Sequence, residues 1–122
     1  MSMTTYFVPE VLSDVRPWGS WEVLDLGPGY KVKRITVHSH SRLSLQTHAC
    51  RAEHWVVVAG VATCTIGDRE VVLRPGERAH VPLGAPHRIS NHEDGDLIIV
   101  EVQSGDYLGE DDIVRLEDDY GR

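Results

Sequence analysis

The sequence has few cysteines, little positive charge and no long apolar stretch, and each shortage excludes a class of protein. Its two cysteines, Cys50 and Cys64, form neither a disulfide framework nor a cysteine-based metal motif. No run of about twenty apolar residues occurs, so we expect no membrane-spanning helix. The N-terminus lacks a basic start followed by an apolar core, so we expect no signal peptide and take the cytoplasm as the default compartment.

The formal net charge is −7, from 19 acidic and 12 basic residues. This balance argues against nucleic acid and against membranes as main partners, because both surfaces are negatively charged. It does not exclude a phosphorylated small molecule, since a few arginines can form a local positive pocket. A length of 122 residues predicts one domain, with no room for a separate nucleotide-binding domain.

Short β-like segments follow one another from Trp21 onward, separated by turn-forming residues. Gly67-Asp68 lies between two β-branched segments and predicts a hairpin. The expected strands span residues 21–26, 30–37, 43–48, 53–58, 61–66, 70–73, 78–82, 87–90 and 97–103. So many short strands indicate an all-β sandwich or barrel.

The two ends of the chain differ from this pattern. Residues 1–15 read as an N-terminal lead-in or arm, and residues 16–122 as the folded domain. Acidic residues at the start of segment 109–116 favour a short C-terminal helix, because negative charge stabilises a helix N-terminus.

Four residues carry the donor atoms that a divalent metal binds: Gln46, His48, Glu53 and His87. Gln46 and His48 are two apart, so their side chains share one face of a strand. Glu53 returns to that face after a tight reversal at residues 49–52, and we expect His87 to meet them in space. Two imidazoles, a carboxylate and an amide oxygen suit one ion of Zn, Co, Mn, Fe or Ni, with Zn as the first choice.

These ligand candidates lie within two longer patterns. From Gln46 the sequence reads Gln-x-His-x4-Glu-x6-Gly, ending at Gly60, and from Gly76 it reads Gly-x5-Pro-x-Gly-x2-His-x3-Asn, ending at Asn91. Both resemble the two cupin motifs, with Gln in place of the first His. The resemblance implies a double-stranded β-helix, also called a jelly-roll barrel, which agrees with the strand pattern.

Further segments resemble one group of cupins, the type II phosphomannose isomerase domain. They are residues 16–19, 30–35, 43–46, 51–55, 101–105 and 107–122. That domain usually forms the C-terminal part of a larger chain that also carries mannose-1-phosphate guanylyltransferase, so the resemblance implies the isomerase part only. Two departures occur: Ser39-His40 replaces a usual Pro-Gly, and Cys50 stands where His is common.

The resemblance implies a metal-dependent aldose–ketose isomerase that interconverts mannose 6-phosphate and fructose 6-phosphate. In the family, the arginine that matches Arg51 is tied to isomerase activity, so we assign Arg51 to catalysis and substrate binding. Arg88 directly follows a ligand and is a candidate phosphate or interface contact.

Two strand residues complete the candidate site. Lys33 has the strand parity of Ile35 and Val37, so we expect it to face the interior, where it would bind phosphate or transfer a proton. A lysine reaching out to solvent at the barrel mouth is the alternative. Glu101 lies on a buried strand and is either the general base or part of a structural ion pair.

Two other functions stay open. His48, Glu53 and His87 also form the ligand set of a non-haem Fe(II) oxygenase, although Gln46 fills a position that oxygen would need. A domain without its usual partner could also be a non-catalytic sugar-phosphate-binding cupin. We expect a homodimer, because cupins often pair through sheet faces. Trp18, Trp21 and Trp55 either supply apolar area for that contact or belong to the core.

Overall fold

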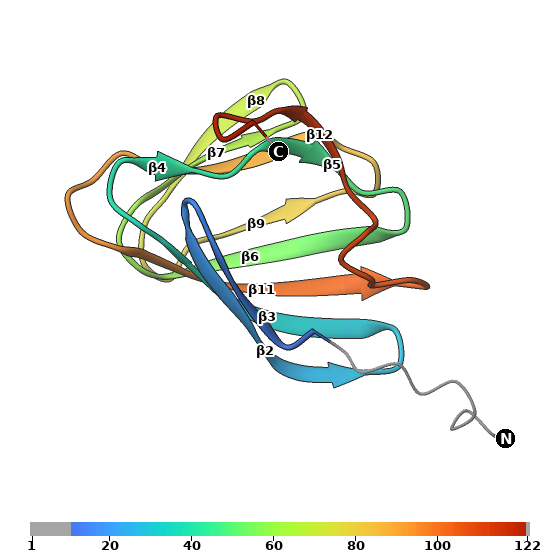
Figure 1. Ribbon diagram of the computed structural model, residues 1–122. Coiled ribbons are helices and arrows are strands. Elements are labelled where there is room, and N and C mark those ends of the chain that lie inside the picture. The colour runs from blue at the N-terminus through green and yellow to red at the C-terminus, as the bar shows by residue number, and fades with distance from the viewer. Residues whose placement is uncertain (1–10, 122) are drawn as a thin grey trace, which may run out of the picture.

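A computed structural model of the protein describes residues 11–121. The regular elements in this range are all β-strands, and they form two antiparallel sheets (Figure 1). Sheet A contains, in spatial order, β1 (Ser13–Arg16), β2 (Gly19–Gly27), β3 (Tyr30–Val37), β11 (Leu97–Gly105), β6 (Arg51–Ala59) and β9 (Arg78–Val81). Sheet B contains β12 (Val114–Glu117), β5 (Leu45–Thr47), β10 (His87–Asn91), β7 (Ala62–Ile66) and β8 (Arg69–Leu73), with β4 (Ser41–Arg42) paired to β10.

The two sheets pack face to face, and strict alternation along the strands decides which residues lie between them. In β6, Arg51, Glu53 and Trp55 are buried, whereas His54 and Val56 are exposed. The core between the sheets consists of Trp18, Trp21, Ile35, Val37, Trp55, Val57, Ala62, Cys64, Ile66, Leu73, Val81, Ile89, Leu97 and Ile99. The three tryptophans therefore belong to the core and offer no surface for contact between two copies.

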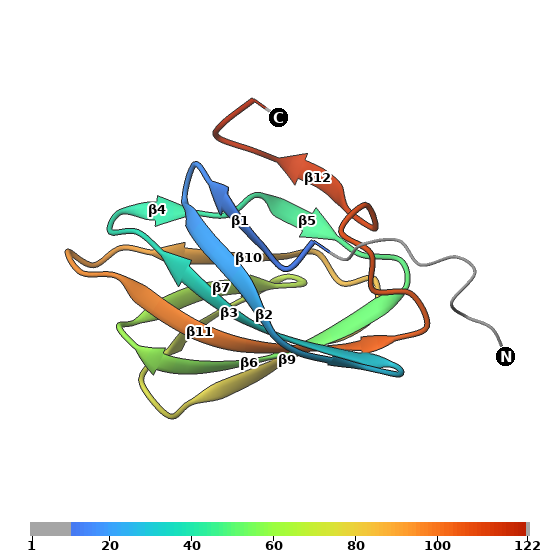
Figure 2. The same ribbon diagram turned by 60° about the horizontal axis from the view of Figure 1, so that its bottom comes forward.

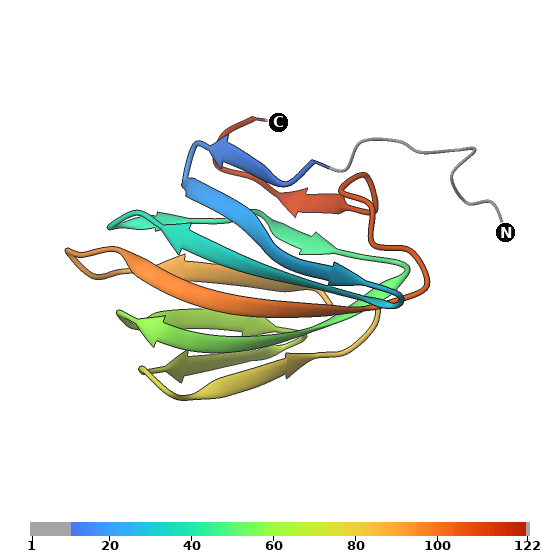
Figure 3. The same cartoon turned by 90° about the horizontal axis from the view of Figure 1, so that it is seen from below.

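One edge strand of each sheet contributes to the pocket that holds the candidate site. β1 is one edge strand of sheet A and β12 is one edge strand of sheet B, and both lie on the same side of the molecule (Figures 2 and 3). The pocket described below lies between the sheets and is lined by residues of both edge strands.

The predicted C-terminal helix over residues 109–116 is wrong, because the structure has a turn followed by β12 in this segment. Glu110 and Asp112 bind a lysine and two backbone amides instead of capping a helix. Pairing of β12 with β5 also covers a strand edge that would otherwise expose unpaired backbone groups. Within residues 11–121, the structure contains no helix that could cross a membrane.

The folded domain includes residues that the sequence pattern assigned to the N-terminal lead-in. Residues 13–16 form β1 and pair with β2, so part of the expected lead-in belongs to sheet A. Residues 1–10 lie outside the described part of the chain.

The turn at Ser39-His40 has the backbone that a glycine usually supplies. His40 adopts φ 52°, in the left-handed region that side chains with a Cβ rarely occupy. Its Nε2 lies 2.8 Å from Asp94 Oδ1. The departure from Pro-Gly therefore changes the residue but keeps a glycine-like turn.

Candidate metal centre

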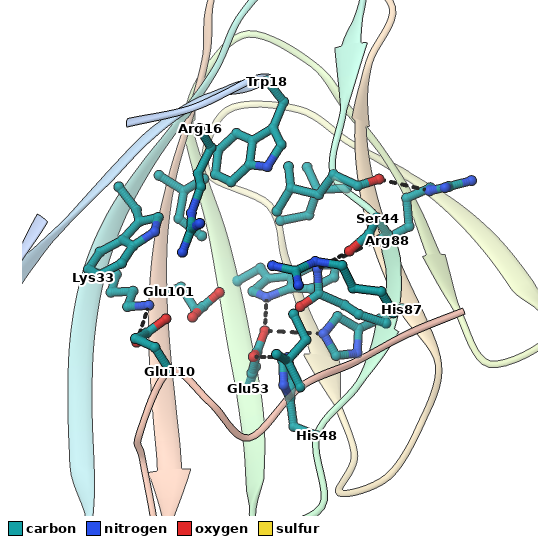
Figure 4. Close-up of a pocket in the computed structure, with 18 of the residues that line it drawn as sticks. Arg16, Trp18, Lys33, Ser44, His48, Glu53, His87, Arg88, Glu101 and Glu110 are labelled. Atoms are coloured by element: carbon teal, nitrogen blue, oxygen red, sulfur yellow. Dashed lines mark hydrogen bonds and ion pairs between the residues drawn. The ribbon is translucent and has the colours of Figure 1, made fainter. Parts of the chain in front are cut away.

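His48, Glu53 and His87 come together in the pocket between the two sheets (Figure 4). His48 follows β5, Glu53 lies on β6 and His87 begins β10, and each is at most 5% exposed. Their candidate ligand atoms all lie within 4.8 Å of one another. His48 Nε2 is 3.2 Å from Glu53 Oε2, and His87 Nε2 is 3.8 Å from Glu53 Oε1.

Both imidazoles are oriented by backbone carbonyls. His48 Nδ1 lies 2.6 Å from Asp112 O, and His87 Nδ1 lies 2.9 Å from Ala85 O. A carbonyl only accepts hydrogen bonds, so Nδ1 carries a proton in each ring and Nε2 is the nitrogen that faces Glu53. In the neutral ring that binds a metal, this Nε2 presents a lone pair. This is the arrangement that orients histidines as metal ligands, and the donor set therefore fits a divalent ion.

Gln46 lies beside this cluster, as the spacing predicted. It pairs with His87 across strands β5 and β10 and lines the same pocket. Its Nε2 donates to Ser44 Oγ at 3.0 Å, so the amide oxygen is the atom left to serve as a ligand. Its role as the fourth ligand stays a prediction.

Glu53 is the electrostatic centre of the cluster. It accepts hydrogen bonds from Arg51 Nε and from Trp55 Nε1, both at 2.9 Å. Burial alone would raise its pKa, but the hydrogen bond from His48 and the charges of His87 and Arg51 lower the pKa overall. Glu53 is therefore a carboxylate over the whole physiological range, which is the protonation state that a metal ligand requires.

Arg51 lies inside the centre and not only at its rim. Its side chain is buried, and one terminal nitrogen is 3.1 Å from His48 Nε2. Burial disfavours the charged guanidinium, yet the nearby carboxylates of Glu53 and Glu101 raise the pKa of Arg51 above its ordinary value. A fixed positive charge thus lies beside the candidate metal ligands.

Lys33 faces the interior on β3, as its parity predicted, and is 4% exposed. Its Nζ lies 2.6 Å from Glu110 Oε2 and 3.8 Å from the centre of the Trp21 ring. The Lys33 charge lowers the pKa of Glu110 against the opposing effect of burial. The sequence pattern does not identify Glu110 as a pocket residue, because it assigns residues 109–116 to a helix.

Glu101 is buried on β11, between Lys33 on β3 and Trp55 on β6 in the register of sheet A. It accepts a 2.6 Å hydrogen bond from Gln103 Nε2. Burial and the negative charge of Glu53 raise the pKa of Glu101 to about 7. A carboxyl group with a pKa near neutrality in a pocket is suited to accept and return a proton.

Arg88 lines the pocket but directs its guanidinium to other groups. Its Nε donates to Leu43 O at 2.9 Å, and its NH1 lies 3.2 Å from Glu117 Oε1. These contacts tie β10 to the segment before β5 and to β12. Its proposed contact with phosphate stays a prediction.

Asp112 holds His48 in place from outside the cluster. Its carbonyl accepts from His48, and its carboxylate accepts from the backbone N–H groups of Ala49 and Cys50 at 2.8 and 2.9 Å. We expect Asp112→Ala to weaken metal affinity by about 10–100-fold, because the turn that positions His48 loses both hydrogen bonds. A competition titration with a chromophoric chelator measures this change.

The control for this prediction is the neighbouring Asp111→Ala. Asp111 accepts a hydrogen bond from the exposed Tyr107 hydroxyl and does not contact the ligands. Equal metal affinity of Asp112→Ala and wild type would contradict the positioning role.

The comparisons with known proteins decide the family. A family model described as "Mannose-6-phosphate isomerase C-terminal" matches residues 10–118. The chain belongs to this family. Among curated proteins, this member of the mannose-6-phosphate isomerase C-terminal family is similar to the xanthan biosynthesis protein XanB of Xanthomonas campestris pv. campestris, to which it is 52% identical over 107 residues. The alginate biosynthesis protein AlgA of Pseudomonas aeruginosa is 51% identical over the same length.

These alignments cover 88% of this chain but only 23% of XanB and 22% of AlgA. The chain therefore spans less than a quarter of the length of these relatives.

Solved structures confirm the fold of this family member. A Klebsiella pneumoniae protein with a double-stranded β-helix domain aligns with TM-score 0.69 over 96% of both chains, at 19% identity. The cupin domain of Schizosaccharomyces pombe Cnp3 aligns with TM-score 0.68 over 71% of this chain and 64% of that one, at 11% identity. The predicted all-β cupin fold is confirmed.

Proposed function

We propose that the chain is a metal-dependent aldose–ketose isomerase that interconverts mannose 6-phosphate and fructose 6-phosphate. The supporting observation is the buried cluster of His48, Glu53 and His87 in one pocket with Glu101, in a chain of the mannose-6-phosphate isomerase C-terminal family. A metal centre beside a carboxyl group of near-neutral pKa is the equipment that proton transfer next to a carbonyl requires.

The reaction moves one proton between two neighbouring carbons of the open-chain sugar. In the direction of the ketose, the carboxylate of Glu101 takes the proton from C2, and the aldehyde oxygen on C1 takes a proton from water to give a cis-enediol. The hydroxyl on C2 then gives its proton to water as the new carbonyl forms, and Glu101 returns its proton to C1. The carboxylate is regenerated, so the cycle is balanced and needs no redox partner.

Charge develops on the two oxygens during this transfer. A divalent cation, Zn first and Co, Mn, Fe or Ni otherwise, supplies Lewis-acid stabilisation of that charge when bound. Arg51 adds N–H donors on the same side of the pocket, beside Glu53. Lys33 faces Glu101 across β3 and β11, and its positive charge favours the carboxylate form of the base.

The names of the relatives place them in xanthan and alginate biosynthesis, so we propose that this chain serves the supply of sugar precursors for polysaccharide. We also propose a homodimer, for which the exposed Val56 and Val58 on the outer face of β6 supply apolar area.

Metal removal tests the proposed reaction. We expect the chelator-treated protein to lose formation of fructose 6-phosphate from mannose 6-phosphate, and one equivalent of a single divalent ion to restore it. A coupled assay follows the product, and elemental analysis follows the metal. If stoichiometrically loaded, folded protein shows no turnover with any of the five metals, the isomerase proposal is wrong for this substrate.

A further inference from the structure

The pocket contains more positive than negative side chains. Its cations are Arg16, Lys33, Arg51, Arg88 and Arg115. Its carboxylates are Glu53, Glu101 and Glu110. Lys33 and Arg51 are buried beside carboxylates, with Lys33 2.6 Å from Glu110 and Arg51 2.9 Å from Glu53. Arg88 is also buried, and its guanidinium donates to the backbone carbonyls of Leu43 and Glu117 at 2.9 and 3.3 Å. The donors of these three side chains are already used within the protein, which makes them poor binding groups for a substrate anion.

Arg16 differs from these three. Among the described residues its ion-pair partner is Asp14, at 3.3 Å, and the two side chains are 29% and 44% exposed. Exposed pairs of this kind contribute little, so the Arg16 guanidinium is readily taken over by a stronger anion. Figure 4 shows Arg16 entering the pocket from β1, on the side away from His48.

Arg115 reaches the same pocket from the opposite sheet. It lies on β12 and pairs with Gln46 across β12 and β5. β1 and β12 are edge strands that lie on the same side of the sandwich (Figure 2), so Arg16 and Arg115 line the pocket from its two sheets. Nothing in the local sequence marks the two residues as a pair, because they lie near opposite ends of the chain.

We propose that Arg16 and Arg115 bind the phosphate group of the substrate at the open side of the pocket. Guanidinium groups bind phosphate oxygens through two parallel N–H donors, and two of them on facing strands suit a dianion. A sugar phosphate held there places its reacting carbons toward His48, Glu53 and Glu101. The identity of the sugar rests on the proposed function, whereas the anion site itself does not.

This assignment changes the roles of residues named from the sequence. Lys33 and Arg51 act at the reacting end of the sugar and do not bind its phosphate. The hairpin of β1 and β2 becomes the element that selects phosphorylated over neutral sugars, because it carries Arg16.

Titration with inorganic phosphate, followed by calorimetry, tests the anion site without any need for turnover. We expect Arg16→Gln and Arg115→Gln each to weaken phosphate binding by about 10–100-fold, the size of a lost charge-assisted hydrogen-bond pair. Arg34→Gln is the matched control, because Arg34 pairs with Glu22 on the exposed side of sheet A. Circular dichroism verifies that each variant is folded, and Arg115→Lys replaces Arg115→Gln if the latter is not.

The outcomes separate the two proposals. Phosphate binding that depends on Arg16, in a wild-type protein without isomerase turnover, supports the anion site and removes the isomerase. With turnover present, the KM for mannose 6-phosphate should rise about 10–100-fold in Arg16→Gln. Wild-type phosphate affinity in Arg16→Gln, loss of binding in Lys33→Gln instead, or no phosphate binding by the wild type at tens of millimolar would each overturn the assignment.

Discussion

Replacing Glu101 with glutamine should lower kcat for mannose 6-phosphate isomerisation by about 10²–10⁴-fold, the usual contribution of a general base. Glutamine keeps the size of the side chain and can still contact Gln103, but it has no basic oxygen to take the proton from C2. Metal content should stay at the wild-type level, because Glu101 is outside the cluster of His48, Glu53 and His87. Steady-state kinetics and elemental analysis on the same sample measure both quantities.

The isomerase activity should also depend on pH through the protonation state of Glu101. Burial and the charge of Glu53 raise the pKa of Glu101 from its ordinary value of 4.5 to about 7 in the metal-free protein. The base acts as a carboxylate, so activity should fall as the pH falls through the pKa of Glu101. A bound cation favours the carboxylate, which puts this acid limb at or below about pH 7.

The raised pKa of Glu101 should make the folded metal-free protein less stable as the pH rises, whereas the activity increases with pH. A carboxyl group whose folded pKa is raised stabilises the fold fully below its unfolded pKa, near 4.5, and loses that contribution as the pH rises through about 7. The metal-free wild type should therefore lose stability over this window more steeply than Glu101→Gln. Wild-type kcat in Glu101→Gln, or identical pH profiles for the two proteins, would remove Glu101 from the mechanism.

Replacing His87 with alanine should abolish both the bound metal and the activity. The imidazole Nε2 of His87 faces Glu53, and no other described side chain at this point of the pocket replaces it. Residues that only orient ligands change metal affinity by about 10–100-fold, and loss of a direct ligand should lower the affinity by more than that. Elemental analysis after dialysis against metal-free buffer measures the loss.

His54→Ala is the matched control for this experiment. His54 lies on β6 next to Glu53, but its side chain is on the outer face, where it stacks on His80 with ring centres 4.5 Å apart. It should keep metal and activity. Stoichiometric metal in His87→Ala would show that the ion binds elsewhere.

The local patterns of the sequence predicted most of the strands, and the structure brings the four candidate ligands into one pocket. Gln46 and His48 share a strand face by spacing alone, and the motif around His87 indicated the second half of the centre. The inward orientation of Lys33 followed from strand parity. All of these features depend on residues that are close in sequence or belong to one motif.

The missed residues reach the site across long separations. Glu110 meets Lys33 and Asp112 meets His48 only after the chain has passed through the other strands of both sheets. Local composition pointed to a helix in this segment, because acidic residues near its start have the same appearance as helix-capping residues. Only the tertiary contacts of the turn before β12 distinguish the two structures.

The candidate ligands belong to both layers of the sandwich, since Glu53 lies on sheet A whereas His87 lies on sheet B. An ion held between them is a cross-link that must be released before the layers separate. Mass action then adds about 2.7 kcal/mol to the free energy of unfolding when free metal is a hundred times its Kd. The heat resistance of this protein would thus follow the metal supply of its surroundings, and a shortage of the ion would cost the cell folded molecules as well as turnover.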